Sequence, residues 1–138
     1  MNSFHTKRLV WKYVETLSKS FLHLCIQGTI EDVKEFYDNY PVNIHDGNDR
    51  PFRTMCSLGK LDIATWLYSQ GDVDIHFDKD SAFRWACFGG HIETAKWLYS
   101  LGDVDICSDN GWAHRNAIKN GHTATIDWLY DIKEHIHL

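Results

Sequence analysis

The sequence predicts an all-α solenoid, a row of stacked helix pairs that follows an N-terminal capping helix. Three observations predict it: a 31-residue internal period, apolar residues at helical spacing inside each period, and glycines where helices should end. One pair of short helices cannot bury its apolar face alone, whereas stacked pairs cover one another. The predicted organisation is therefore a single domain over residues 1–138.

A glycine marks the same point in every period. Gly28, Gly59, Gly90 and Gly121 follow one another at intervals of 31 residues without insertion or deletion. Other columns keep this register, among them Phe21/Phe52/Phe83, Cys25/Cys56/Cys87, Trp66/Trp97/Trp128 and Tyr37/Tyr68/Tyr99/Tyr130. The register predicts four repeats at approximately residues 19–49, 50–80, 81–111 and 112–138, each made of two helices.

The capping helix is expected over residues 1–18. Its apolar residues recur at helical steps and should cover the first helix pair; they are Leu9, Val10, Tyr13, Val14 and Leu17. At the other end of the chain, Thr123 and Thr125 predict a more polar outer wall for the last long helix.

The third repeat shows the expected elements of one helix pair. Its segment SAFRWACF predicts a shorter helix that Gly89 and Gly90 terminate. Residues 92–101 predict a longer amphipathic helix, with Gly102 at a left-handed C-terminal cap. The polar stretch GDVDIHFDKD, which joins one helix pair to the next, predicts a projecting turn or a short hairpin.

This order of short helix, Gly-His, longer helix, Gly-Asp-Val-Asp and polar loop resembles the ankyrin repeat over about residues 19–138. The phrase AKWLYSLGDVDI is similar to the divergent ankyrin repeats that large DNA viruses encode in many copies. The repeat has 31 residues, whereas about 33 are usual, which predicts shorter hairpins. In place of the family's Thr-Pro-Leu-His motif stand residues 50–53, 81–84 and 112–115, which end in Arg53, Arg84 and Arg115.

Three columns are open to both structural and functional interpretations. Equivalent residues in neighbouring repeats lie roughly 10 Å apart, whereas a disulfide needs Cα atoms within about 7 Å. The column of Cys25, Cys56 and Cys87 is therefore expected to be buried and apolar. We expect the column of Trp66, Trp97 and Trp128 to pack in the core. The arginine column is either a basic stripe for an acidic partner or, as we expect, bonds loop carbonyls of adjacent repeats.

Composition and motifs exclude several functions. The net charge of −5 argues against a nucleic-acid or anionic-membrane surface, and no apolar run is long enough to span a bilayer. Unpaired cysteines indicate a reducing compartment, so an intracellular, cytoplasmic protein is expected, in a host cell if the viral resemblance holds. The sequence contains no phosphate loop, zinc-protease motif or nucleophile–base pair, and we expect no cofactor, no metal and no catalysis.

The resemblance implies a protein partner, because ankyrin repeats bind proteins through a concave groove built from hairpin tips and the exposed face of the shorter helix. Carried over by position, the partner-binding residues are Phe77, Asp78, Lys79, Asp80, Trp85, Phe88, Asp109, Trp112, Asn116 and Lys119. Their four aromatic rings predict an exposed apolar patch of the kind that marks binding sites. The alternative is that these rings fold back onto neighbouring helices.

The expected function is non-catalytic binding of a protein, by a monomer or weak homodimer. A viral origin would make the chain an adaptor for a host protein or a decoy of one. Two alternatives remain at this stage: a structural module that self-associates through the same aromatic patch, and an enzyme with its site in the groove.

Overall fold

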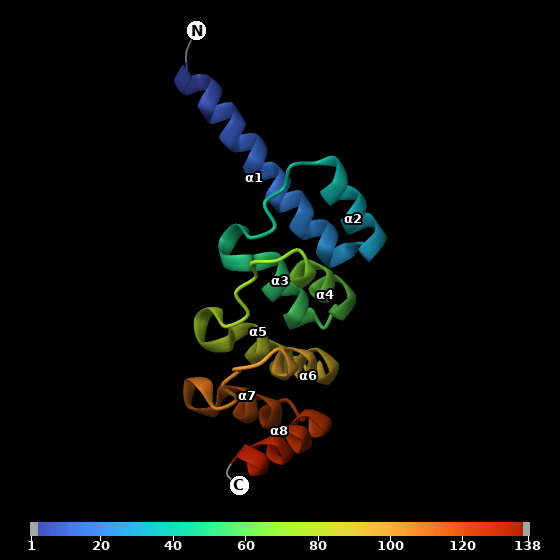
Figure 1. The fold of residues 1–138 in the computed structure, drawn as a ribbon, viewed down its shortest axis with the longest axis vertical. Helices are drawn as coiled ribbons and strands as arrows, with labels where there is room; N and C mark the ends of the chain where they lie inside the picture. The colour runs from blue at the N-terminus through green and yellow to red at the C-terminus, as the bar shows by residue number, and fades with distance from the viewer. Residues whose placement is uncertain (1–2, 137–138) are drawn as a thin grey trace. The chain divides into compact units, whose positions relative to one another are not determined.

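The computed structural model describes the backbone of residues 3–136 and the side chains of residues 6–135, and the only regular elements in this part are helices (Figure 1). They are α1 (Ser3–Gln27), α2 (Ile30–Asn39), α3 (Asp46–Leu58), α4 (Leu61–Ser69), α5 (Phe77–Phe88), α6 (Ile92–Ser100), α7 (Ser108–Lys119) and α8 (Thr123–Ile136). The predicted all-α class is confirmed. None of the described helices is both long and apolar enough to cross a bilayer.

The chain divides into two compact units, Met1–Pro51 and Phe52–Leu138. Unit 1 holds α1, α2 and the first residues of α3. Unit 2 holds the rest of α3 and helices α4 to α8.

In unit 1, α1 packs against α2 around Phe21, Cys25 and Val33, which are fully buried. The sequence predicted a capping helix over residues 1–18 and then a separate helix. Instead, α1 continues without a break to Gln27, because no glycine or proline interrupts it; residues 1 and 2 lie outside the described part. Of the apolar residues predicted to cover the first helix pair, only Leu17 is buried, and the others are exposed.

A reciprocal cap starts α2. The Thr29 hydroxyl accepts a hydrogen bond from the Asp32 backbone N–H, and the Asp32 carboxylate accepts one from the Thr29 N–H. These bonds favour the charged carboxylate and lower the pKa of Asp32 below its ordinary value. The cap ends α1 and starts the next helix within a few residues.

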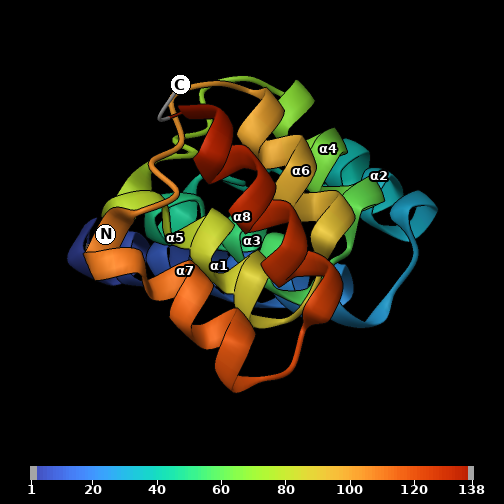
Figure 2. The same cartoon turned by 90° about the horizontal axis from the view of Figure 1, so that it is seen from below.

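In unit 2 the helices follow one another as the pairs α3/α4, α5/α6 and α7/α8 (Figures 1 and 2). Helix α5 packs against both α6 and α7, and α7 packs against α8. The tryptophans of successive pairs make repeated contacts: Trp97 meets Tyr68 edge-on with ring centroids 5.6 Å apart, and Trp128 meets Tyr99 in the same way at 5.7 Å. Trp97 and Trp128 thus pack on the preceding helix pair, but the predicted core position of the column is wrong, because Trp66, Trp97 and Trp128 are all only half-buried.

Histidine also recurs between successive pairs. A Cβ atom built on Gly59 would overlap the ring of His91, and one built on Gly90 would overlap the ring of His122. His122 Nε2 lies 2.8 Å from the carbonyl oxygen of Phe88, which holds its ring in place. Each histidine therefore occupies the space that a side chain on the preceding repeat's glycine would need.

The sequence predicted a projecting turn or a short hairpin between helix pairs. In unit 2 these loops form left-handed turns. Asp78, Lys79 and Asp80 have φ values of 53°, 55° and 57°, and residues 109–111 repeat this conformation. A left-handed turn costs L-residues roughly 1–2 kcal/mol each. Five of these six residues are Asp, Asn or Gly, which tolerate it best, and Lys79 is the exception.

Hydrogen bonds from the arginines at 31-residue spacing offset part of this free-energy cost. Arg84 donates from Nε to the Lys79 carbonyl (3.0 Å) and from Nη2 to the Asp78 carbonyl (2.9 Å). Arg115 makes the equivalent bonds to the carbonyls of residues 110 and 109. The expectation that these arginines bond loop carbonyls is confirmed for Arg84 and Arg115. The guanidinium of Arg53 lies over the ring of Phe77.

The expected polar outer wall of the last repeat is confirmed for Thr123, which is exposed, and is wrong for Thr125. Thr125 is 1% exposed and faces the interior, whereas Ile118 on α7 and Tyr130 on α8 are each 51% exposed. Thr125 is buried because it lies on the helix face that Ile63 and Thr94 occupy in earlier repeats, both of which are buried too.

The buried cysteine column is confirmed. Cys25, Cys56 and Cys87 have no exposed surface, while Cys107 is exposed in a loop. Burial raises the pKa of the Cys87 thiol to about 12 and also raises the pKa of Cys56.

One thiol is therefore expected to react with an aromatic disulfide reagent in the native protein, and four in denaturant, because the attacking species is an accessible thiolate. Absorbance of the released thiol counts both. A Cys107→Ser variant is the control and should leave no fast-reacting thiol. Rapid reaction of several thiols in the native protein would contradict the buried column.

Candidate binding surface

Three aromatic rings of unit 2 form one exposed cluster, called here the aromatic surface: Trp85 and Phe88 on α5 and Trp112 on α7. Trp85 lies 5.1 Å from Phe88 and 5.2 Å from Trp112 between ring centroids, and Phe88 stacks on Trp112 at 5.7 Å with an interplanar angle of 26°. Trp85 is 45% exposed and Phe88 is 37% exposed. The rings thus contact one another and still present apolar area to solvent.

Helix geometry explains why the rings converge. Trp85 and Phe88 are three residues apart, so they lie on the same face of α5. Trp112 is at the start of the right-handed part of α7, just after the left-handed residues 109–111, and α5 packs directly against α7. The rings of neighbouring helices consequently meet across the α5–α7 contact.

The buried side chain of Arg84 contacts the aromatic surface at Trp112. The guanidinium carbon of Arg84 lies 5.2 Å from the centroid of the Trp112 ring, a cation–π distance. Arg84 is 7% exposed, and its two hydrogen bonds to the loop carbonyls fix its plane. The sequence predicted for Arg84 either a place in a basic stripe or a bond to loop carbonyls, and no contact with an aromatic ring. The sequence feature that could have indicated this contact is the position of Arg84 directly before Trp85.

Polar residues border the aromatic surface on α7. Asn116 donates from Nδ2 to the Trp112 carbonyl at 2.9 Å, and Lys119 is exposed in the last turn of the helix. An apolar centre with a polar border is the usual composition of a protein interface.

Not all predicted residues join the aromatic surface. Phe77 is half-buried and contacts Arg53, with the guanidinium carbon 4.9 Å from its ring centroid. Asp80 is buried; its carboxylate lies 2.5 Å from His76 Nδ1 and accepts the Asp105 backbone N–H at 3.1 Å. Both side chains therefore hold the loop in place.

The remaining predicted charges form a balanced network beside the rings. Lys79 Nζ and Arg84 Nη1 each lie 3.7 Å from the Asp109 carboxylate, and Arg84 Nη2 lies 3.8 Å from that of Asp78. The side chains of Asp78 and Lys79 are more than half exposed, so solvent weakens their ion pairs. Two cations and two anions leave this edge of the surface without a strong net charge.

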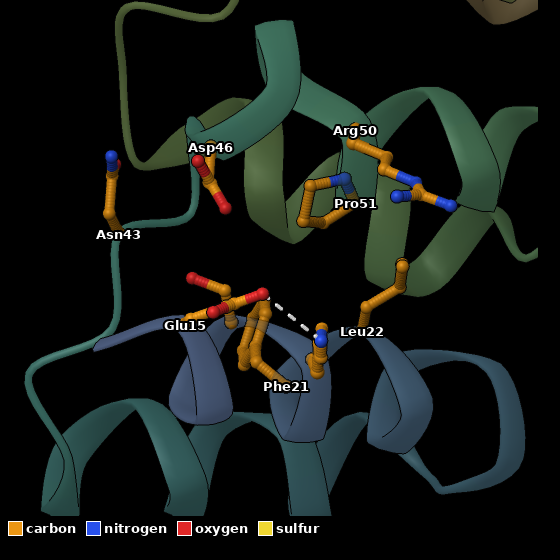
Figure 3. Close-up of a pocket in the computed structure, with 9 residues that line it drawn as sticks. Glu15, Phe21, Leu22, Asn43, Asp46, Arg50 and Pro51 are labelled. Atoms are coloured by element: carbon orange, nitrogen blue, oxygen red, sulfur yellow. Dashed lines mark ion pairs between the residues drawn. The ribbon is translucent and has the colours of Figure 1, made fainter. Parts of the chain in front are cut away.

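A small pocket lies in unit 1. It lies between α1 and the first residues of α3, with Glu15 on one side and Asp46 and Arg50 on the other (Figure 3). Lys19, which also lines it, forms an ion pair with Glu15 at 3.1 Å. Its volume of about 200 Å³ is below the roughly 300–1,000 Å³ of ordinary ligand pockets. None of the predicted binding residues lines it.

Within the described side chains, no three His, Cys, Asp or Glu residues come together as a metal site. The chemistry that the aromatic surface offers is burial of apolar area, with hydrogen bonds and charges at its border.

Comparison with known proteins adds no family to this description. The chain matches no protein-family model and no curated protein sequence.

Proposed function

We propose that this chain is a non-catalytic protein-interaction module that binds a partner protein through the aromatic surface. The observation that carries the proposal is the exposure of Trp85, which lies at the centre of a ring cluster held by Arg84. A large aromatic side chain that is rigid before binding loses little conformational entropy on association, and such residues are typical interface hot spots.

The proposed architecture is a solenoid of four ankyrin-type helix pairs. Two sets of repeated contacts in unit 2 support it: tryptophan on the preceding tyrosine, and histidine on the preceding glycine. The 31-residue sequence period extends the same pattern into unit 1. In this arrangement the aromatic surface belongs to the inner helices α5 and α7, on the side where ankyrin-type proteins contact their partners.

A partner that fits this surface presents an apolar side chain to the three rings and hydrogen-bonding groups to Asn116 and Lys119. The balanced charges of Lys79, Arg84, Asp78 and Asp109 favour specificity over long-range attraction, because they create little net field. The partner's anchor is thus expected to be apolar with polar flanks, not a highly charged segment.

The test compares proteins captured from a lysate by the wild-type chain and by a Trp85→Ala/Phe88→Ala variant. Loss of two hot-spot rings should weaken specific capture by at least about 30-fold, which corresponds to about 2 kcal/mol. Tyr40→Ala is the matched control, because Tyr40 is an exposed aromatic residue (47%) in unit 1. Circular dichroism should show unchanged helix content in both variants.

Identical captured proteins for the wild type and the double variant would refute the site. Self-association through the same rings has its own readout, since light scattering over a dilution series would show a dimer that the double variant loses. That result would replace the partner protein by a second copy of the chain.

A further inference from the structure

The aromatic surface offers hydrogen-bond donors as well as apolar area. Trp85 and Trp112 each carry an indole N–H, a group that can donate a hydrogen bond but cannot accept one. Among the described residues, no acceptor receives a hydrogen bond from either indole. Solvent or a bound partner must therefore supply both acceptors, because an unpaired donor that loses its water is costly.

Lys119 adds a further donor on the polar border. It is exposed in the last turn of α7 and forms no ion pair within the part of the chain that the structure describes. The Asp109 carboxylate, in contrast, already lies 3.7 Å from each of two cations. Asn116 supplies a side-chain oxygen as an acceptor, and its Nδ2 already donates to the Trp112 carbonyl. Donors therefore predominate among the polar groups left to a partner.

Two common conformations of a bound peptide match this surface poorly. Strand addition needs the free edge of a sheet, and the described residues form helices and no strand. A bound helix uses its backbone carbonyls for its own hydrogen bonds. Laid on the rings, it would leave the indole donors of Trp85 and Trp112 without backbone acceptors.

A proline-rich segment in the polyproline II conformation has the complementary groups. This conformation has no internal hydrogen bonds, so its carbonyls are free to accept. Proline also lacks the backbone N–H, and such a segment therefore carries acceptors without matching donors. Its rings provide apolar area for aromatic side chains, and its preformed shape reduces the entropy lost on binding. The balanced charges beside the rings suit an uncharged segment of this kind.

We propose that the aromatic surface binds a proline-rich segment of the partner protein in the polyproline II conformation. Proline rings pack on Trp85 and Phe88, and backbone carbonyls of the segment accept hydrogen bonds from the indoles of Trp85 and Trp112. Lys119 donates to a further carbonyl at the border. This assignment rests on the function proposed above, because both use the same rings.

The test titrates the ¹⁵N-labelled full chain with capped decaproline, which adopts the polyproline II conformation in water. The indole N–H signals of Trp85 and Trp112 are expected to move downfield at millimolar peptide, because each donor gains a carbonyl acceptor. The Trp85→Phe and Trp112→Phe variants assign the two signals. The signals of the tryptophans outside the aromatic surface should stay in place.

Trp85→Phe also separates the donor from the ring. It keeps an aromatic side chain and removes the N–H, so decaproline should bind about threefold to tenfold more weakly, the effect of one lost hydrogen bond. Trp11→Phe is the matched control, since it makes the same change at an exposed tryptophan (73%) in unit 1 and should leave the affinity unchanged.

A capped glycine–alanine peptide of the same length is the control for the ligand. It has free carbonyls but neither proline rings nor a fixed conformation, and it should bind at least about tenfold more weakly than decaproline. An uncharged amphipathic helical peptide of leucine, alanine and glutamine tests the helix as the occupant.

The proposal is overturned if decaproline moves neither indole signal, or if the glycine–alanine peptide binds equally well. Tighter binding of the helical peptide than of decaproline would also overturn it, since the occupant would then be a helix. Capture from a lysate that depends on Trp85 and Phe88, in the absence of decaproline binding, would reject the proline-rich segment and keep the surface as an interface.

Discussion

Replacement of Phe83 by alanine is expected to lower the free energy of unfolding of unit 2 by about 3–5 kcal/mol. Phe83 is 1% exposed, and its ring lies 6.1 Å from that of Trp128 between centroids. The truncation removes buried apolar area and leaves a cavity that the surrounding helices cannot fill, because both sides of the ring are held by different helix pairs. Urea unfolding followed by tryptophan fluorescence measures the change, since five of the six tryptophans lie in unit 2.

Phe88→Ala is the matched control for this prediction. It makes the same chemical change in the same helix, but Phe88 is 37% exposed and belongs to the aromatic surface. Its loss should cost well under half as much, because less area returns to water and no closed cavity forms. Equal losses from the two variants would contradict the assignment of Phe83 to the core and of Phe88 to the surface.

The second large effect is expected for Gly90→Ala, at about 2–5 kcal/mol of destabilisation. The φ of 72° at Gly90 costs an alanine roughly 1–2 kcal/mol. The added methyl group would also overlap His122, whose ring cannot turn away without losing its hydrogen bond to the Phe88 carbonyl. Such overpacking costs about 1–3 kcal/mol more.

Gly121→Ala separates these two contributions. Gly121 has the same φ as Gly90 but nothing within 4 Å of the added methyl group. It should therefore show the backbone cost of about 1–2 kcal/mol and no steric part. The difference between the two variants, obtained from urea midpoints, measures the histidine contact. A difference near zero would show that successive helix pairs do not meet as described.

The sequence was sufficient to predict the helix pairs of unit 2 and their period, but not the continuous helix α1. Apolar spacing and glycine positions depend on local backbone geometry, and the identity of residues at 31-residue intervals shows that the same packing problem is solved repeatedly. The buried cysteine column and the carbonyl bonds of Arg84 and Arg115 were predicted on that basis and are confirmed. The placement of Thr125 on an outer wall was wrong, although its column already held Ile63 and Thr94, which are buried as Thr125 is.

The candidate site could be predicted only in part. Trp85 and Phe88 share a helix face by spacing alone, and the period places Trp112 on the next pair. Whether Asp80 lies at an accessible tip depended on the loop conformation, and three consecutive left-handed residues turn its carboxylate inward to His76. No local rule predicts such a run, because it costs free energy that only the Arg84 hydrogen bonds and other tertiary contacts offset.

Amino-acid order alone therefore specifies the helices of unit 2 and the columns that recur, because these properties follow from short-range geometry and from repetition. The folded arrangement alone decides which members of a column face solvent. Cys87 and Ile118 occupy the same column, yet one is buried and the other is half exposed. Exposure differs because it depends on whether a neighbouring helix pair covers the residue. The residues of that neighbouring pair belong to another repeat, so the sequence of one repeat does not determine exposure.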